Sequence, residues 1–185
     1  KNVLVVAGEI MSRVVNWKER ESCILWGDGA GAAVITETDE GAEIMSTHIH
    51  TDGENGDTLL MPGGGSKTTP ISYESVDKGK HFLKMIEANK SFKVAVSRFA
   101  EACEEAVATN GYTIDDVDVI VPHQANLRIL QGMAKKLKVP MEKVYMTIEK
   151  YGNISSATVP IALDDAVRNG TIDKDKLVLL TAFGG

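Results

Sequence analysis

Cysteine is scarce in this sequence, with two in 185 residues, and several other features are missing as well. Cys23 and Cys103 lie far apart in unlike contexts, which excludes a disulfide framework and a cysteine-rich metal site and favours a reducing cytoplasm. No run approaches the roughly 18 apolar residues of a membrane-spanning helix, and the opening "KNVLVVAGEI" does not have the pattern of a signal peptide. The formal net charge of -6 argues against general nucleic-acid binding.

What the sequence does contain is an ordinary globular composition, 43% hydrophobic and 25% charged, enough for one domain with a real core. Its two ends look unusual. Lys1 stands almost inside a strand-like run, and the hydrophobic stretch 177–185 ends in glycines. We therefore expect the chain to be part of a larger protein that covers this last strand.

The hydrophobic patterns alternate between strand and helix spacing, which predicts an α/β fold with no internal repeat. Helical spacing covers 75–110, 126–137 and 156–168, with Ser155 or Ser156 as the cap of the last helix. We expect a mostly parallel sheet with an antiparallel section early in the chain. The strands are expected at 3–7, at 22–37 around a glycine-rich bend, and at 42–53, 117–122 and 177–181.

The glycine-rich segment "GDGAGA" at 27–32 invites a nucleotide-binding interpretation, which its spacing does not support. Glycines at 27, 29 and 31 do not fit G-x-G-x-x-G, and a strand follows where a helix is required. Backbones that approach closely at a tight bend are the favoured explanation.

Two further groups have an ordinary structural explanation. His48 and His50 are two residues apart and share one side of an expected strand, but too few ligands accompany them for a metal site, so we expect surface histidines. Cys23 and Cys103 lie in apolar contexts with no cationic group or helix start to lower their pKa. We expect both to be small hydrophobic residues, not nucleophiles.

His123 and Asn153 are the strongest candidates for chemistry. His123 follows a predicted buried strand and precedes a helix, the position at which open α/β sheets form their sites. Asn153, thirty residues on, stands in a glycine-flanked turn before another helix. Two such turns can bring an imidazole and an amide together as neutral donors to an enolate or thioester oxyanion. A capping or packing role for His123 is the alternative.

The segments "VPHQANLRI", "YGNISSATVPIALDDAV" and "LVLLTAFGG" resemble the C-terminal half of β-ketoacyl-acyl-carrier-protein synthase III, a condensing enzyme with a thiolase-like fold. "ILWGDGAGAAVI" and "MSTHIHTDG" resemble earlier segments of the same family, so the resemblance covers essentially residues 1–185. It implies half of a thiolase-like fold, with a mixed, mostly parallel sheet covered by helices on both faces. It also implies that the N-terminal half and the final strand are absent.

The resemblance implies a Cys-His-Asn site that joins an acyl-CoA starter to malonyl-acyl-carrier protein with loss of CO2, the step that initiates fatty acid synthesis. His123 and Asn153 would hold the malonyl thioester carbonyl and stabilise the enolate. Gly185 matches a glycine whose N–H serves the oxyanion hole on the cysteine side. Both acyl compounds are substrates, so no resident cofactor and no metal are expected.

The resemblance also assigns binding residues. The CoA tunnel matches Arg20, Trp26, Phe92, Asn126 and Arg128. Basic positions for docking the acidic carrier protein match Lys93, Arg128, Lys135 and Lys136, although a solvated helix face is an equal explanation for each lysine.

The departure from the family pattern is the nucleophile, because neither cysteine occupies its place. The chain is expected to be inactive alone and to act with the N-terminal half of the same enzyme, as a homodimer when full length. A non-catalytic module that binds CoA or carrier protein is one alternative. A related synthase that makes a polyketide or quinolone precursor is another.

Overall fold

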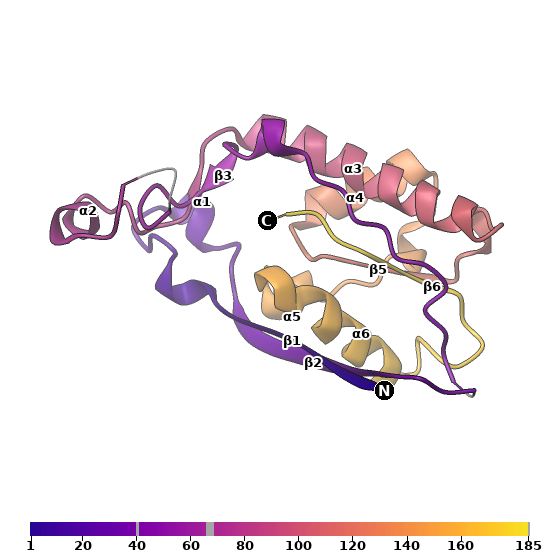
Figure 1. Ribbon diagram of the computed structural model, residues 1–185. Coiled ribbons are helices and arrows are strands. Elements are labelled where there is room, and N and C mark those ends of the chain that lie inside the picture. Colours follow the sequence, from indigo (N-terminus) through magenta and orange to yellow (C-terminus); the bar gives the residue numbers. More distant parts are fainter. Residues whose placement is uncertain (40, 66–68, 185) are drawn as a thin grey trace.

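The computed structural model describes residues 1–39, 41–65 and 69–184. Figure 1 shows their elements in four layers. Helices α3 (Ala88–Thr109) and α4 (Leu127–Leu137) form the first layer, and the strand pair β5 (Val119–Pro122) and β6 (Val178–Thr181) the second. Helix α6 (Thr158–Arg168) is the third layer, and the long pair β1 (Asn2–Ile10) and β2 (Asp28–Thr36) is the fourth. The predicted α/β class is confirmed.

The pair β5–β6 lies at the centre because helices cover both of its faces. Successive side chains on a strand point to opposite sides. Ile120 therefore packs in the cluster formed by α3 and α4, while Val119 and Val121 pack with Ala162 and Ala166 of α6. The expectation of helices on both faces holds for this pair.

Strand pairing is mixed, as expected, but its parallel part is smaller than the sequence suggested. In the described ranges β5 and β6 are parallel, whereas β1–β2 and the short pair β3 (Leu59–Leu60) and β4 (Lys84–Met85) are antiparallel. Parallel neighbours need a long crossover connection. The chain supplies one through α4 and α6 between β5 and β6.

The glycine-rich segment forms part of a continuous strand, so the expected bend is wrong. The strand expected before it is also wrong, because residues 20–23 form the short helix α1 (Arg20–Cys23). Close approach is nevertheless what the glycines permit. A Cβ on Gly29 would lie 3.1 Å from Ile154 Cδ1, and one on Gly31 would lie 2.9 Å from Pro160 Cβ. The glycines let β2 rest directly on α6.

The third expected strand, at 42–53, is not formed. In its place an extended segment runs beside α3 and is followed by the 3₁₀ helix η2 (Gly53–Asn55) (Figure 1). The polar side chains of this segment bind α3, because Glu105 pairs with both His48 and His50, and Arg98 pairs with Asp52. Contacts of side chains with a helix have replaced the expected strand ladder.

The helix expected at 75–110 is two helices with β4 between them. The first, α2 (Tyr73–Asp77), starts at a capping box formed by Ser72 and Ser75 and is followed by Gly79 at φ +65°. That left-handed residue turns the chain before it can continue as a helix. The second helix, α3, runs over 22 residues.

The helix predicted at 126–137 is confirmed as α4, whereas the predicted cap of α6 is wrong. Asn126 caps α4 by accepting a hydrogen bond from the Ile129 N–H at 2.9 Å. Helix α6 follows the 3₁₀ helix η5 (Ser155–Ala157), and neither serine caps it. The remaining short elements are η1 (Met11–Arg13), η3 (Ile114–Asp116), η4 (Met141–Lys143) and α5 (Ile148–Tyr151).

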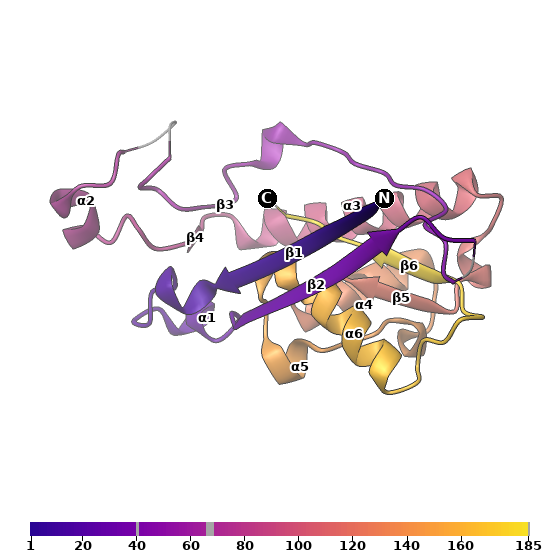
Figure 2. The ribbon, with the colours of Figure 1, turned by 60° about the horizontal axis from the view of Figure 1, so that its bottom comes forward.

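One face of β1–β2 lies against α6 and η5, and the other face carries uncovered apolar side chains. Figure 2 shows this strand pair in front of α6. Leu4 is 65% exposed and Val34 is 66% exposed, on the side away from α6. Across the described ranges, no helix is long and apolar enough to cross a membrane.

Candidate active site

The end of β5 places His123 at one end of the central strand pair. Its backbone N–H donates to the Thr181 carbonyl at 2.7 Å, which continues the β5–β6 pairing one residue beyond Pro122. Its ring then turns toward the start of α6, where Nδ1 lies 2.6 Å from Thr158 Oγ1. The ring is therefore held from both sides of the site, by β6 through its backbone and by α6 through its side chain.

Asn153 is held by the segment that leads into β2. Its N–H donates to the Leu25 carbonyl at 2.8 Å, and its carbonyl accepts from the Gly27 N–H at 3.0 Å. Gly152, at φ +70°, provides the left-handed turn before it. A Cβ on Gly27 would lie 1.9 Å from the Tyr151 carbonyl oxygen, so only glycine fits this crossing. The segment leading to β2 thus fixes the Asn153 backbone.

Two hydrogen bonds fix the orientation of the Asn153 carboxamide. Its Oδ1 accepts from the Ser155 N–H at 2.8 Å, and its Nδ2 donates to the Ala125 carbonyl at 3.3 Å. Because an amide nitrogen carries two hydrogens, one N–H remains for a further acceptor. The side chain is 7% exposed, so this donor is presented from a nearly dry position.

The structure brings His123 and Asn153 to the same neighbours. The Ala125 N–H donates to the His123 carbonyl at 2.9 Å, and the Ala125 carbonyl accepts from Asn153. On the other side, Thr158 contacts the His123 ring and lies 2.9 Å from the carbonyl of Ser155, whose N–H binds Asn153. The two turns therefore meet as one polar cluster.

Burial keeps the His123 ring neutral. It lowers the pKa of His123 to about 4, and a backbone hydrogen bond with Ser155 opposes the shift. At neutral pH the imidazole therefore carries a single proton, on one of its two ring nitrogens. A neutral imidazole beside a neutral amide is suited to binding a polarised carbonyl oxygen.

Gln124, which the sequence did not single out, links the end of β5 to the segment before α5. It is fully buried, and its amide nitrogen Nε2 donates to the carbonyls of Pro122 and Tyr145 at 2.8 and 3.2 Å. Its Oε1 accepts from the N–H groups of Thr147 and Ile148 at 2.8 and 3.1 Å. This side chain attaches the start of α5 to the end of β5.

Thr158 was also missed, and so was the part played by the two serines before it. Ser156 donates to Glu9 of β1 at 2.6 Å, which lowers the pKa of that carboxyl, while Ser155 adopts φ +49° beside Asn153. The run of hydroxyl residues before an apolar helix was the available signal. It was interpreted as a cap, but these side chains bind His123 and β1 instead.

Trp26 and Asn126 flank the cluster, as parts of the two segments that form it. Trp26 makes a parallel β-bridge with Asn153, and Asn126 follows Ala125 as the cap of α4. The other tunnel candidates lie on separate helices. Arg20 is exposed at the start of α1, Phe92 is 37% exposed in the first turns of α3, and Arg128 is exposed on α4.

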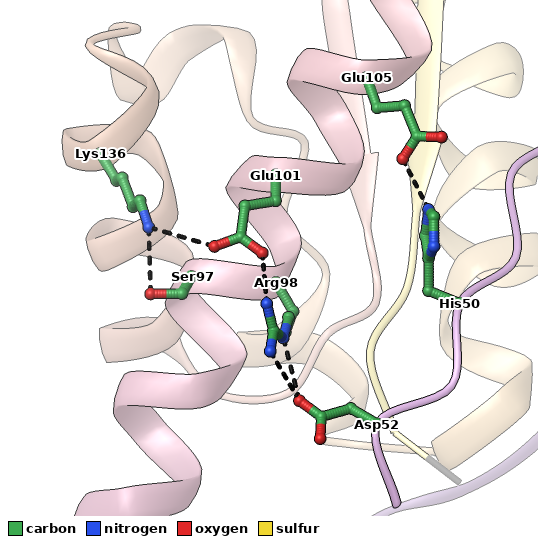
Figure 3. Close-up of polar contacts among 7 residues, drawn as sticks. All are labelled: His50, Asp52, Ser97, Arg98, Glu101, Glu105 and Lys136. Atoms are coloured by element: carbon green, nitrogen blue, oxygen red, sulfur yellow. Dashed lines mark hydrogen bonds and ion pairs between the residues drawn. The ribbon is translucent and has the colours of Figure 1, made fainter.

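The basic candidates lie on α3 and α4, and one of them is partly neutralised. Lys93 and Lys135 are exposed. Lys136 donates to Ser97 at 3.0 Å and lies 3.9 Å from Glu101, which also pairs with Arg98 at 2.7 Å (Figure 3). The same close-up shows His50 bound to Glu105 from the extended segment.

The remaining candidates are placed as follows. Gly185 lies outside the described residues. Cys103 is fully buried and burial raises the pKa of its thiol to about 11, whereas Cys23 is half-buried. Among the described residues no cluster of three His, Cys, Asp or Glu side chains could hold a metal ion. His48 and His50 both bind Glu105, at 2.9 and 2.6 Å.

Solved structures share the fold of this chain. The 3-oxoacyl-[acyl-carrier-protein] synthase III of Aquifex aeolicus matches with a TM-score of 0.87 and 37% identity, over 100% of this chain and 55% of that chain. The β-ketoacyl synthase III of Thermus thermophilus matches with a TM-score of 0.86 and 35% identity, over 99% and 55%. The fold is that of the thiolase-like condensing enzymes.

Sequence comparisons give the family within that class. A model of 3-oxoacyl-[acyl-carrier-protein] synthase III matches residues 1–53, and a model of its C-terminal part matches residues 107–185. The β-ketoacyl-[acyl-carrier-protein] synthases III of Caldanaerobacter subterraneus and Xanthomonas euvesicatoria are 45% and 46% identical over 100% of this chain. The chain belongs to the 3-oxoacyl-[acyl-carrier-protein] synthase III family, and it spans 55% of the length of these two relatives.

Proposed function

We propose that this chain supplies the His–Asn part of a decarboxylating ketosynthase. The complete enzyme would join an acyl-CoA starter to malonyl-acyl-carrier protein and so begin fatty acid synthesis. The meeting of His123 and Asn153 around Ala125 and Ser155 is the observation that supports this function.

In this proposal the malonyl thioester carbonyl accepts hydrogen bonds from the free Asn153 N–H and from His123 Nε2. As CO2 leaves, the electron pair of the breaking bond moves toward that carbonyl oxygen and forms an enolate. Fixed donors aimed at this oxygen stabilise the transition state without reorganisation. The enolate carbon then attacks the carbonyl of the acyl group that a cysteine holds as a thioester. A carbon–carbon bond forms, the carbon–sulfur bond breaks, and the cysteine leaves as a thiolate.

The substrates are acyl-CoA and the malonyl carrier protein, with no resident cofactor. Arg20, Trp26, Phe92, Asn126 and Arg128 would line the approach of the CoA arm, with Arg128 and Arg20 as partners for phosphate. Lys93, Arg128, Lys135 and Lys136 would meet the acidic carrier protein. Because Lys136 already pairs with Glu101, Lys93 and Lys135 are the stronger docking candidates. The proposed location is the cytoplasm.

The proposed enzyme needs a second part, because burial raises the pKa of the Cys103 thiol to about 11 and neither cysteine occupies the place of the family's nucleophile. The relatives are nearly twice as long as this chain, and the outer face of β1–β2 is apolar and uncovered. We infer that the N-terminal half of a longer synthase packs on this side and brings the cysteine and the Gly185 oxyanion hole into use. The complete enzyme would be a homodimer, and this chain alone would be inactive.

A priming ketosynthase for a polyketide is the second candidate. The priming β-ketosynthase of the R1128 polyketide pathway matches this chain with a TM-score of 0.78 and 34% identity, over 97% of this chain and 52% of that one. The His–Asn chemistry would be the same in both enzymes. Comparing acyl-CoA starters as substrates of the complete enzyme would separate them.

The test uses the complete synthase that contains this chain. Replacing His123 or Asn153 with alanine should reduce decarboxylation of malonyl-carrier protein by about 10²-fold or more, the usual cost of losing one oxyanion donor. Acyl transfer from acyl-CoA to the cysteine should fall much less. Release of labelled CO2 and mass spectrometry of the acylated enzyme measure the two steps separately.

His50→Ala is the matched control, since it removes a histidine that binds Glu105 on the outside of α3 and should leave both steps unchanged. Normal decarboxylation in both His123→Ala and Asn153→Ala would contradict the assignment. If the complete protein neither takes up an acyl group nor releases CO2, a non-catalytic CoA-binding or carrier-binding module becomes the better explanation.

A further inference from the structure

The hydroxyl of Thr158 faces two possible acceptors at once. Thr158 is the first residue of α6 and is 2% exposed. Its Oγ1 lies 2.6 Å from His123 Nδ1 and 2.9 Å from the Ser155 carbonyl oxygen. A hydroxyl has one proton to donate, so it donates to one of these groups and not to both.

The carbonyl of Ser155 does not depend on this hydroxyl. It already accepts the backbone N–H of Thr158 at the end of η5. The shorter of the two contacts is the one to the imidazole nitrogen. A neutral imidazole has one acceptor nitrogen, which must be paired when it is buried.

We propose that the Thr158 hydroxyl donates to Nδ1 of His123 and thereby holds the ring in the tautomer that carries its proton on Nε2. Thr158 is then a positioning residue: it contacts the ring at Nδ1, and it makes the opposite ring nitrogen, Nε2, a hydrogen-bond donor. The catalytic consequence rests on the proposed function, in which Nε2 donates to the thioester oxygen. The tautomer itself does not depend on that function.

Removing the hydroxyl should reverse the tautomer. The Ser155 carbonyl oxygen is an acceptor that lies 2.9 Å from Thr158 Oγ1, the atom that contacts the ring. Without Thr158 Oγ1, Nδ1 would take the proton and donate it to Ser155, which leaves a lone pair on Nε2. Two lone pairs would then face each other at the thioester oxygen, so the ring would lose its function as a donor. Asn153 would remain the only one of the two with an N–H for that oxygen.

The first test reads the tautomer directly, in this chain. Protein with ¹⁵N-labelled histidine rings is recorded by long-range ¹H–¹⁵N correlation at neutral pH, and His123→Gln assigns the signal among the four histidines. We expect a protonated Nε2 and an unprotonated Nδ1 in the wild type and in Thr158→Ser, and the reverse in Thr158→Val. A wild-type ring with its proton on Nδ1 overturns the proposal, as does a Thr158→Val ring that keeps it on Nε2.

The second test reads the consequence in the complete synthase. Thr158→Val should lower the rate of malonyl decarboxylation about 10-fold to 100-fold, with an unchanged KM, and Thr158→Ser should restore it to within a few-fold of the wild type. A merely structural role would lower acyl transfer to the cysteine equally. Equal losses in both steps, or no rescue by serine, would overturn the positioning role even if the tautomer is as inferred. If His123→Ala also decarboxylates normally, the proposed function fails instead.

Discussion

The two parts of this chain, residues 1–87 and 88–184, differ sharply in how they bury apolar side chains. Of the buried apolar residues in the described ranges, only Met11 and Val15 belong to the first part. The second part packs α3, α4 and α6 around β5–β6, with Phe99, Leu130 and Met133 fully buried. The first part is a long strand pair with one uncovered apolar face, followed by extended segments and short elements (Figures 1 and 2).

The candidate site lies where these two parts meet. His123 belongs to the dense part, whereas the backbone of Asn153 is held by Leu25 and Gly27 of the sparse one. This difference shows that the first part adds little to the hydrophobic core and instead fixes the position of Asn153. Its glycines permit close contact with the segment 151–154 and with α6, and the hydrogen bonds of Leu25 and Gly27 hold the backbone of Asn153 there.

The largest effect should come from the core of the dense part. Leu130→Ala, at a fully buried position, should lower the free energy of unfolding of the chain by about 3 kcal/mol, because it leaves a cavity between α3 and α4. The same substitution at Leu4, which is 65% exposed, should cost less than about 0.5 kcal/mol. Urea unfolding of both variants measures the difference, and equal costs would remove the contrast between the two parts.

The next effect should come from the contact between the parts. Gly27→Ala places a methyl group where the Tyr151 carbonyl oxygen lies, so the backbone around Asn153 must shift, at about 2 kcal/mol. The matched control is Gly8→Ala, whose added Cβ would meet Ala30 at an ordinary 3.7 Å. In spectra of the chain, backbone amide shifts at 151–155 should move in the first variant and stay in the second. Unmoved shifts in Gly27→Ala would show that this crossing does not position Asn153.

The smallest effect concerns the segment 46–52, which side chains alone attach to α3. Hydrogen bonds from two histidines lower the pKa of Glu105, with the larger contribution from His48 and the smaller from His50. A carboxyl with a lowered folded-state pKa contributes stability above its unfolded pKa and loses it as the pH falls through the folded value. Amide exchange in 46–52, corrected for its intrinsic rate, should therefore rise on acidification.

Glu105→Gln should show fast exchange in this segment at all pH values, since an amide cannot accept both histidines as a carboxylate does. Glu104→Gln changes an exposed neighbour on the same helix and serves as the control. Exchange that is independent of pH in the wild type would mean that Glu105 does not hold the segment.

Much of this protein follows from local sequence. The period of hydrophobic residues predicted β5, β6 and α4, because these features depend on neighbours within one or two turns. The same pattern of strand, turn and helix led to the prediction that His123 and Asn153 form the site. The strand expected at 42–53 failed for the opposite reason. Its alternating pattern suits a strand, but nothing in the segment itself says that α3, with Arg98 and Glu105, lies beside it.

The sequence by itself determined that a histidine and an asparagine stand at the two turns, at 123 and 153. Its hydrophobic residues also alternate between strand and helix spacing, which determined the α/β class. Only the tertiary structure decided that Ser155 binds Asn153, that Thr158 contacts His123, and that Gln124 attaches α5 to the end of β5. It also decided that Gly27 and Gly29 permit contact between segments instead of making a bend. The physical reason is distance along the chain. A hydrogen bond between His123 and Thr158 joins residues 35 positions apart, and no local propensity records such a partner.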